Sequence, residues 1–137
     1  MPMVCAMSDQ ARTAPSAEAM EALARAALAR IPEPFAGHLS DIVLLVEEFA
    51  DDDTLAAMEM EPYELTGLYH GSPVGEKSAF DGMRLPDRIH LYRQPLLAEW
   101  CETGVDLGDL IRHVVVHEVG HHFGLSDDDM HALEDSV

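Results

Sequence analysis

The chain has 137 residues, which is the size of one domain and enough to bury a modest core. Asp and Glu outnumber Lys and Arg by 26 to 8, so the formal net charge is −18. Because so acidic a surface repels nucleic-acid phosphates and anionic membranes, we expect neither as a partner. The charge is typical of a highly soluble protein, and the sharper alternative is attraction of a basic substrate or partner.

Residues 1–14 are expected to form a flexible tail, and residues 15–137 a single domain. Ser16 is suited to cap a helix that runs to Arg30. The apolar residues of this helix recur with the helical period and are Met20, Leu23, Ala27, Leu28 and Ile31. The apolar run within 41–49 predicts a buried strand. Asp51 to Asp53 then supply acidic residues for a short helix that Pro62 closes.

The middle of the chain predicts two more strands. Residues 65–72 form a weak strand, and residues 73–87 a loop rich in Gly, Pro and charge. Residues 88–93 alternate polar and apolar side chains, as a half-buried strand does. Residues 95–101 are expected to be helical. We therefore predict an α+β domain with a small mixed sheet of three or four strands, packed by the N-terminal helix and by a helix further along.

The segment 105–123 is expected to form that second helix, capped by Thr103 or Asp106. The β-branched run from Val114 to Val116 favours a strand, but length and helical periodicity decide for a helix. Gly124 is placed to end it in the left-handed conformation. Ser126 can cap a last short helix over 127–134.

His117, Glu118 and His121 form an HExxH motif within this helix. On a helix, residues four apart lie on one face, so both imidazoles can reach one zinc ion. On a strand the same residues would lie about 13 Å apart and could not share an ion. Glu118 then lies beside the metal and can act as general base towards a metal-activated water and as acid towards the leaving amine.

Two further residues extend the motif to HExxHxxGxxD. Chance alone gives HExxH in about 4 of 100 shuffled chains, and adding Gly124 and Asp127 lowers this to about 3 in 10,000. The glycine lets the chain leave the helix sharply, so that Asp127 can turn back as third ligand. Asp128, and less favourably Asp129 or His131, are alternatives. The competing interpretation is that these carboxylates only suit a helix N-terminus and that the histidines form a polar helix face.

Four other side chains are weaker candidates. His113 lies four residues before His117 but lacks a following base, so we expect it to be buried or solvated. His122 points away from His121 and is expected to make a supporting contact. Tyr69 and Tyr92 could donate to an oxyanion, although roles in the core or at the surface are more typical. The strand over 88–93 is either an edge strand that binds extended substrate or an ordinary sheet strand.

The segments HEVGHHFGLSD and LPDRIHLYRQPL resemble the small bacterial zincin-like metallopeptidases of minimal size, over residues 35–135. The HExxHxxGxxD pattern is also similar to that of metzincins with aspartate as the third ligand. The resemblance implies zinc ligands His117, His121 and Asp127, with Glu118 as base. Metzincins carry a methionine turn well downstream of the third ligand, whereas here Met130 follows Asp127 closely, so a stripped-down fold is expected.

These patterns predict zinc-dependent hydrolysis of a peptide bond in a peptide or protein substrate, by a monomer. The alternative is a zinc-containing peptide- or protein-binding module with little or no catalysis. Residues 1–15 lack the basic and apolar regions of a signal peptide, and no apolar run approaches the ~20 residues of a membrane span. Cys5 and Cys101 are too few for a disulfide framework. The expected compartment is the cytoplasm.

Overall fold

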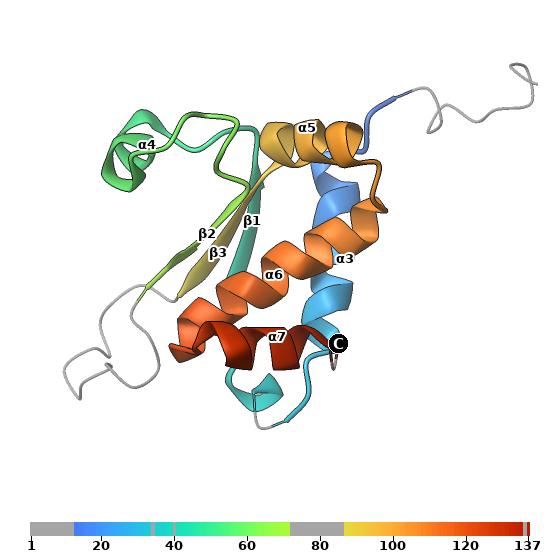
Figure 1. The fold of residues 1–137 in the computed structure, drawn as a ribbon, viewed down its shortest axis with the longest axis vertical. Helices are drawn as coiled ribbons and strands as arrows, with labels where there is room; N and C mark the ends of the chain where they lie inside the picture. Colours follow the sequence, from blue (N-terminus) through green and yellow to red (C-terminus); the bar gives the residue numbers. More distant parts are fainter. Residues whose placement is uncertain (1–12, 34, 40, 72–86, 136) are drawn as a thin grey trace, which may run out of the picture.

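The computed structural model describes residues 13–33, 35–39, 41–71, 87–135 and 137. Helices and the strands of a small sheet are interspersed along the chain (Figure 1). In chain order the elements are α3 (Ala17–Ala29), a 3-10 turn (Ala36–His38), β1 (Val43–Glu47), α4 (Asp52–Met58), β2 (Gly67–His70), β3 (Arg88–Tyr92), α5 (Arg93–Thr103), α6 (Leu107–Phe123) and α7 (Asp127–Asp135). The α+β class is confirmed. Most of the predicted tail and of the 73–87 loop lies outside the described residues.

The sheet has three strands in the described part of the chain, in the order β1-β3-β2. β1 pairs with β3 in parallel, with Leu45 opposite His90, and β2 pairs with β3 antiparallel, with Leu68 opposite His90. Of the two alternatives for 88–93, the ordinary sheet strand is correct and the edge strand is wrong, because β3 is bonded on both sides. Its pairing partners on both sides come earlier in the chain, which a local pattern cannot reveal. Among the described strands, β2 is the edge beside α6.

Helices α3 and α6 pack against one face of the sheet and against each other (Figure 1). Ile89 and Leu91 of β3 point into this main core and are fully buried. The run from Val114 to Val116 is buried throughout, because α6 has α3 on one side and β2 on another. Burial against two elements outweighs the poor helix propensity of valine. The prediction of a helix here is confirmed.

Helix α3 begins as predicted, with the Ser16 hydroxyl accepting a hydrogen bond from the Ala19 amide (3.1 Å). Its buried face differs in one position from the expected stripe. Leu23 is 37% exposed, whereas Ala24 is fully buried. Which of the two neighbouring residues is buried depends on how the helix packs against the core, and residue period alone does not indicate this.

Helix α4 and the residues around it form a smaller apolar cluster on the other face of the sheet. Tyr92 and Leu65 are buried there with Leu55 of α4, and Leu68 packs against them. Strand alternation explains the division, because Tyr92 follows Leu91 and points to the opposite face. Asp51 caps α4 by accepting from the Thr54 amide (2.7 Å).

The caps of the last two helices position the HExxH segment. Asp106, rather than Thr103, accepts from the Asp109 amide (3.1 Å) and starts α6. Gly124 ends α6 at φ 67°, as predicted for a left-handed cap. Ser126 then starts α7 by accepting from the Asp129 amide (3.2 Å). The chain thus reverses within a few residues, and α7 packs back on α6. None of the described helices is both long and apolar enough to cross a membrane.

Candidate active site

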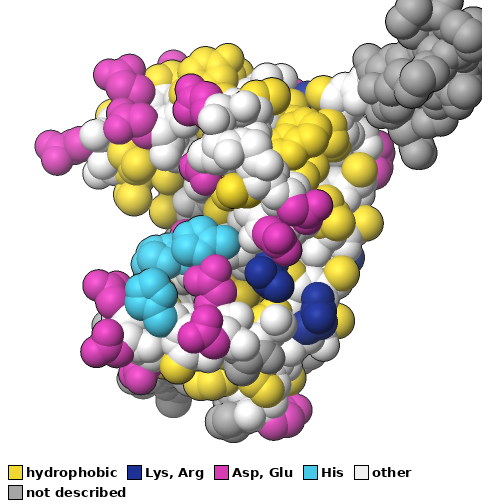
Figure 2. All heavy atoms as spheres, turned by 45° about the vertical axis from the view of Figure 1, so that its right-hand side comes forward, with side chains coloured by type: hydrophobic (Ala, Val, Ile, Leu, Met, Phe, Trp, Pro, Cys, Tyr) yellow, Lys and Arg dark blue, Asp and Glu magenta, His cyan; other side chains and the backbone are white. Residues whose placement is uncertain are grey.

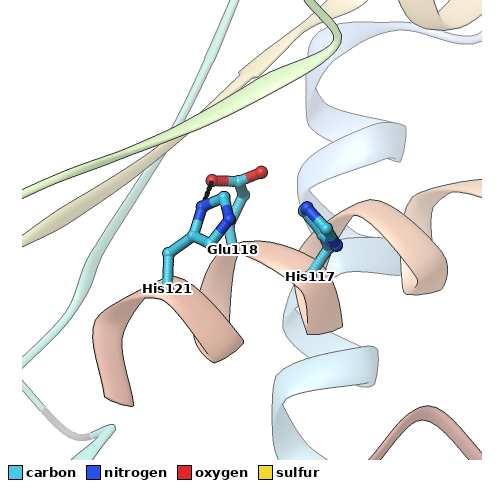
Figure 3. Close-up of side chains that lie close together, drawn as sticks. All are labelled: His117, Glu118 and His121. Atoms are coloured by element: carbon cyan, nitrogen blue, oxygen red, sulfur yellow. Dashed lines mark hydrogen bonds and ion pairs between the residues drawn. The ribbon is translucent and has the colours of Figure 1, made fainter. Parts of the chain in front are cut away.

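The side chains of His117, Glu118 and His121 come together on α6 beside strand β2 (Figure 3). One potential ligand atom from each lies within 4.8 Å of the others, and the two imidazole centroids are 4.7 Å apart. Both histidines are exposed, while Glu118 is buried. The helix therefore presents two imidazoles to solvent over a carboxylate held against the sheet.

Glu118 is fixed by two hydrogen bonds to the same oxygen. Its Oε1 accepts from the backbone amide of Tyr69 on β2 (2.9 Å) and lies 3.0 Å from Nδ1 of His121. Only 7% of the Glu118 side chain is exposed. Figure 3 shows the second oxygen on the side of His117. The edge strand and the helix thus hold the carboxylate in one orientation, with Oε1 bonded to His121 and the other oxygen on the side of His117.

A group of buried polar side chains supports the strand that holds Glu118. His122 Nδ1 lies 3.1 Å from Oδ2 of Asp87 and 3.2 Å from the Tyr69 hydroxyl, and both His122 and Asp87 are less than 5% exposed. Gly71, at φ 146°, passes so close that an added Cβ would lie 2.2 Å from Asp87 Oδ1. The supporting contact expected of His122 is therefore present. It holds Tyr69 of β2, the residue whose backbone amide binds Glu118.

Asp127 is the first residue of α7 and is exposed. It lines a cavity of about 150 Å³ with His117, Met130 and His131, but it does not belong to the tight group of His117, Glu118 and His121. Asp128 and Asp129 are also exposed in the first turn of α7. The choice of Asp127 as third ligand stays a prediction.

Met130 packs directly on α6 beneath the motif. A Cβ built on Gly120 would lie 2.6 Å from Met130 Cγ and 2.9 Å from its sulfur, so a larger residue requires Met130 or α7 to shift. Met130 also lines the cavity beside His117. The motif glycine between Glu118 and His121 thus has a packing role that the HExxH pattern does not specify.

The surface around the motif is rich in histidine and carboxylate. Figure 2 shows histidine side chains grouped on one face with Asp and Glu side chains beside them. His113 lies one turn before His117, is 55% exposed, and bonds through Nδ1 to Glu134 of α7 (2.7 Å). It is solvated, as expected, and its carboxylate partner belongs to another helix.

The two tyrosines have packing roles. Tyr92 lies in the smaller apolar cluster and is 2% exposed, and this burial, with Glu47, Asp51 and Glu118 nearby, raises its pKa to about 12. The Tyr69 ring packs edge-on against His122 at 5.4 Å between centroids. Of the two, only Tyr69 bonds to Glu118, and it does so through its backbone amide.

Sequence reasoning missed the Tyr69 amide and the Asp87 carboxylate. A backbone donor has no side-chain signature, so no motif could have found it. Asp87 falls at the end of a charged, Gly- and Pro-rich segment, where one carboxylate looks like any other. Its position immediately before the alternating strand was the only signal.

A His-Glu-His group on a helix that lies beside the edge of a small mixed sheet is consistent with a minimal zincin-like fold. The sequence agrees: residues 39–137 match the family described as zincin-like metallopeptidase. The chain belongs to this family, whose name implies zinc binding and proteolysis in general terms. No curated protein matches the chain.

Proposed function

We propose that this protein hydrolyses peptide bonds with zinc held by His117 and His121 and with Glu118 as general base. The observation that carries the proposal is the group of two imidazoles and one carboxylate within 4.8 Å on α6. The two imidazole nitrogens suit zinc, and the carboxylate lies close enough to serve a water bound to it. Both histidines are exposed, which favours a catalytic site open to substrate over a closed structural site with four protein ligands.

Asp127 is our choice for the third ligand. It shares a cavity wall with His117, and it is exposed at the start of α7. Asp128 is the alternative, because it lies in the same helical turn. A carboxylate oxygen is an accepted zinc ligand beside two histidines and leaves a coordination position for catalysis.

Glu118 performs the proton transfers in this proposal. His117 and His121 would hold the zinc, which when bound would supply polarisation of the scissile carbonyl and acidification of a water molecule. Glu118 takes the proton from the attacking water and delivers it to the leaving amine, a role worth about 10²–10⁴ in rate. The bond from the Tyr69 amide keeps the carboxylate from rotating away between these two steps. Pre-set orientation of this kind lowers the barrier without a further ligand.

The proposed substrate is a peptide or protein segment in extended conformation. Strand β2 lies beside Glu118 and is an edge among the described strands, so it can pair with a substrate backbone. The net charge of −18 favours basic segments over acidic ones. We further propose that residues 15–137 act as one monomeric domain, without nucleic-acid or membrane partners.

The experiment compares wild type with Glu118→Gln for zinc content and for cleavage of a broad peptide library. The amide has nearly the shape of the carboxylate and can still accept from Tyr69, so the variant should keep zinc and the fold. Peptide cleavage should fall about 10²–10⁴-fold. Glu99→Gln, an exposed change on α5, is the matched control and should cleave like wild type.

Two outcomes contradict the proposal. Loss of zinc in Glu118→Gln would make Glu118 a ligand and move the base elsewhere. Absence of cleavage by a zinc-loaded wild type across the library would favour a peptide-binding module. The cavity beside His117 is small, about 150 Å³, and this favours the peptide-binding module as the second candidate. Catalysis also needs surface that positions the substrate.

A further inference from the structure

A second group of potential ligands lies on the sheet face opposite α6. Each strand contributes one residue: Glu47 from β1, His70 from β2 and His90 from β3. Ile89 and Leu91 point into the main core, so strand alternation directs His90 to the other face. With Asp51 at the start of α4, these three residues line a cavity of about 130 Å³, and the rest of its wall is formed by Thr54, Arg88 and Tyr92.

The two ring nitrogens of His90 have different environments. Nδ1 is bonded to the Glu47 carboxylate. Nε2 is buried and has no hydrogen-bond partner in the described part of the chain. A histidine whose one nitrogen is held by a carboxylate while the other is left available is the arrangement found at metal ligands. A buried polar atom without a partner is also unfavourable, and a bound cation would remove that cost.

His70 and Asp51 lie where they can complete such a site. His70 pairs with Arg88 and is therefore a diagonal neighbour of His90, and the two rings are 4.9 Å apart. Diagonal side chains on antiparallel strands are within reach of each other. Asp51 accepts from the Thr54 amide, but a carboxylate has about four acceptor positions and keeps capacity for a cation.

We propose that His70, His90 and Asp51 form a second site for zinc or another divalent transition metal, with Glu47 orienting His90. Imidazole and carboxylate donors suit zinc, cobalt, nickel and copper. The donors are less closely gathered than those of the HExxH group, the only such set within 4.8 Å in the described chain. Binding therefore requires the partly exposed His70 and the exposed Asp51 to rotate inward, which makes this the weaker of the two sites.

The test counts bound zinc in four proteins, by titration followed by elemental analysis. They are wild type, a variant without the HExxH ligands (His117→Ala with His121→Ala), a variant without the second pair (His70→Ala with His90→Ala), and the combination of all four changes. The expected stoichiometries are two, one, one and zero. Glu99→Gln, an exposed change on α5 away from both sites, is the control and should keep two.

Circular dichroism establishes that each variant is folded. If His90→Ala disturbs the sheet, His70→Gln alone serves, because His70 is partly exposed and its loss should still abolish one equivalent. Glu47→Gln should weaken the second site about 10–100-fold, as expected for the partner that orients a ligating histidine.

The proposal is overturned if the variant without His117 and His121 binds no zinc below about 100 µM, or if removing His70 and His90 leaves the stoichiometry unchanged. Because the second site is measured with the HExxH ligands absent, its failure would leave the proposed peptidase function untouched, and loss of catalysis would leave this site untouched.

Discussion

Replacement of Gly120 by alanine tests whether α7 is packed under the HExxH helix as the structure has it. The new Cβ would lie 2.6 Å from Met130 Cγ, 2.9 Å from Sδ and 3.1 Å from Cε. The nearest of these atoms is close to the backbone, so rotation of the end of the side chain cannot relieve the clash. Either Met130 adopts another rotamer or α7 moves away from α6.

The magnitude follows from two opposing contributions. Overpacking a close-packed site costs about 1–3 kcal/mol. Alanine is favoured over glycine within a helix by about 1 kcal/mol. Gly120→Ala should therefore lower the free energy of unfolding by about 0–2 kcal/mol. Met130→Ala, which empties a side chain that is 9% exposed, should lower it by about 2–5 kcal/mol.

The double variant separates packing from helix propensity. With Met130 shortened, the methyl group that Gly120→Ala adds occupies space that the methionine has left. The loss in the double variant should then be smaller than the sum of the single losses by at least about 1 kcal/mol. Urea unfolding measures all three variants, and each kcal/mol corresponds to about 3–5 °C in Tm for a chain of this size.

Gly108→Ala is the matched control on the same helix. Its Cβ would meet Asp106 Oδ2, the tip of a side chain, at 3.0 Å and Leu23 Cδ2 at an ordinary 3.7 Å, so this position is less crowded than Gly120. Its stability should stay within about 1 kcal/mol of wild type. Zinc affinity should fall in Gly120→Ala and stay unchanged in Gly108→Ala, because only Gly120 lies within the motif. Additive losses, or a Gly120→Ala protein more stable than wild type, would refute the packing of Met130 on α6.

Three further predictions concern the site and its support. Asp127→Ala should weaken zinc binding far more than Asp128→Ala in a competitive chelator titration; equal losses would mean that only the acidic cluster matters. Asp87→Asn and His122→Asn should each speed amide hydrogen exchange in β2, because each breaks the contacts that link Asp87, His122 and Tyr69 of β2. Unchanged exchange would contradict the role of Asp87 and His122 in supporting β2. Burial raises the pKa of Tyr92 from 10.0 to about 12. The unfolded chain therefore releases this proton at lower pH than the folded protein, and the free energy of unfolding falls as pH rises from 10 towards 12. In urea unfolding over that range, Tyr92→Phe should show a smaller fall in the free energy of unfolding than wild type.

Much of the local structure was predictable because each helix carries its own boundary signals. Ser16, Asp106 and Ser126 cap helices as their positions indicate, and Gly124 ends α6 in the left-handed conformation. Capping depends on side chains within three residues of the helix end, so it is encoded locally. The same holds for His117 and His121, whose common face follows from the helical repeat alone.

Strand order and core depth were not predictable in this way. Pairing β1 with β3 brings together residues more than forty positions apart, and no local pattern distinguishes a central strand from an edge strand of similar composition. On α3, Ala24 rather than Leu23 lies on the buried face, and this depends on how closely the helix approaches the core. Such distances are set by all packed side chains together.

The sequence by itself determined the helix that carries the HExxH motif, its caps, and the shared face of the two histidines, because these depend on interactions within a few residues. Only the tertiary structure decided that β2 supplies the amide that holds Glu118, and that Asp87 and His122 meet beneath it. The Tyr69 amide lies forty-nine residues from Glu118 in the chain. A contact of that span exists only after the sheet and α6 have packed, since backbone donors are alike at every position until the fold selects one.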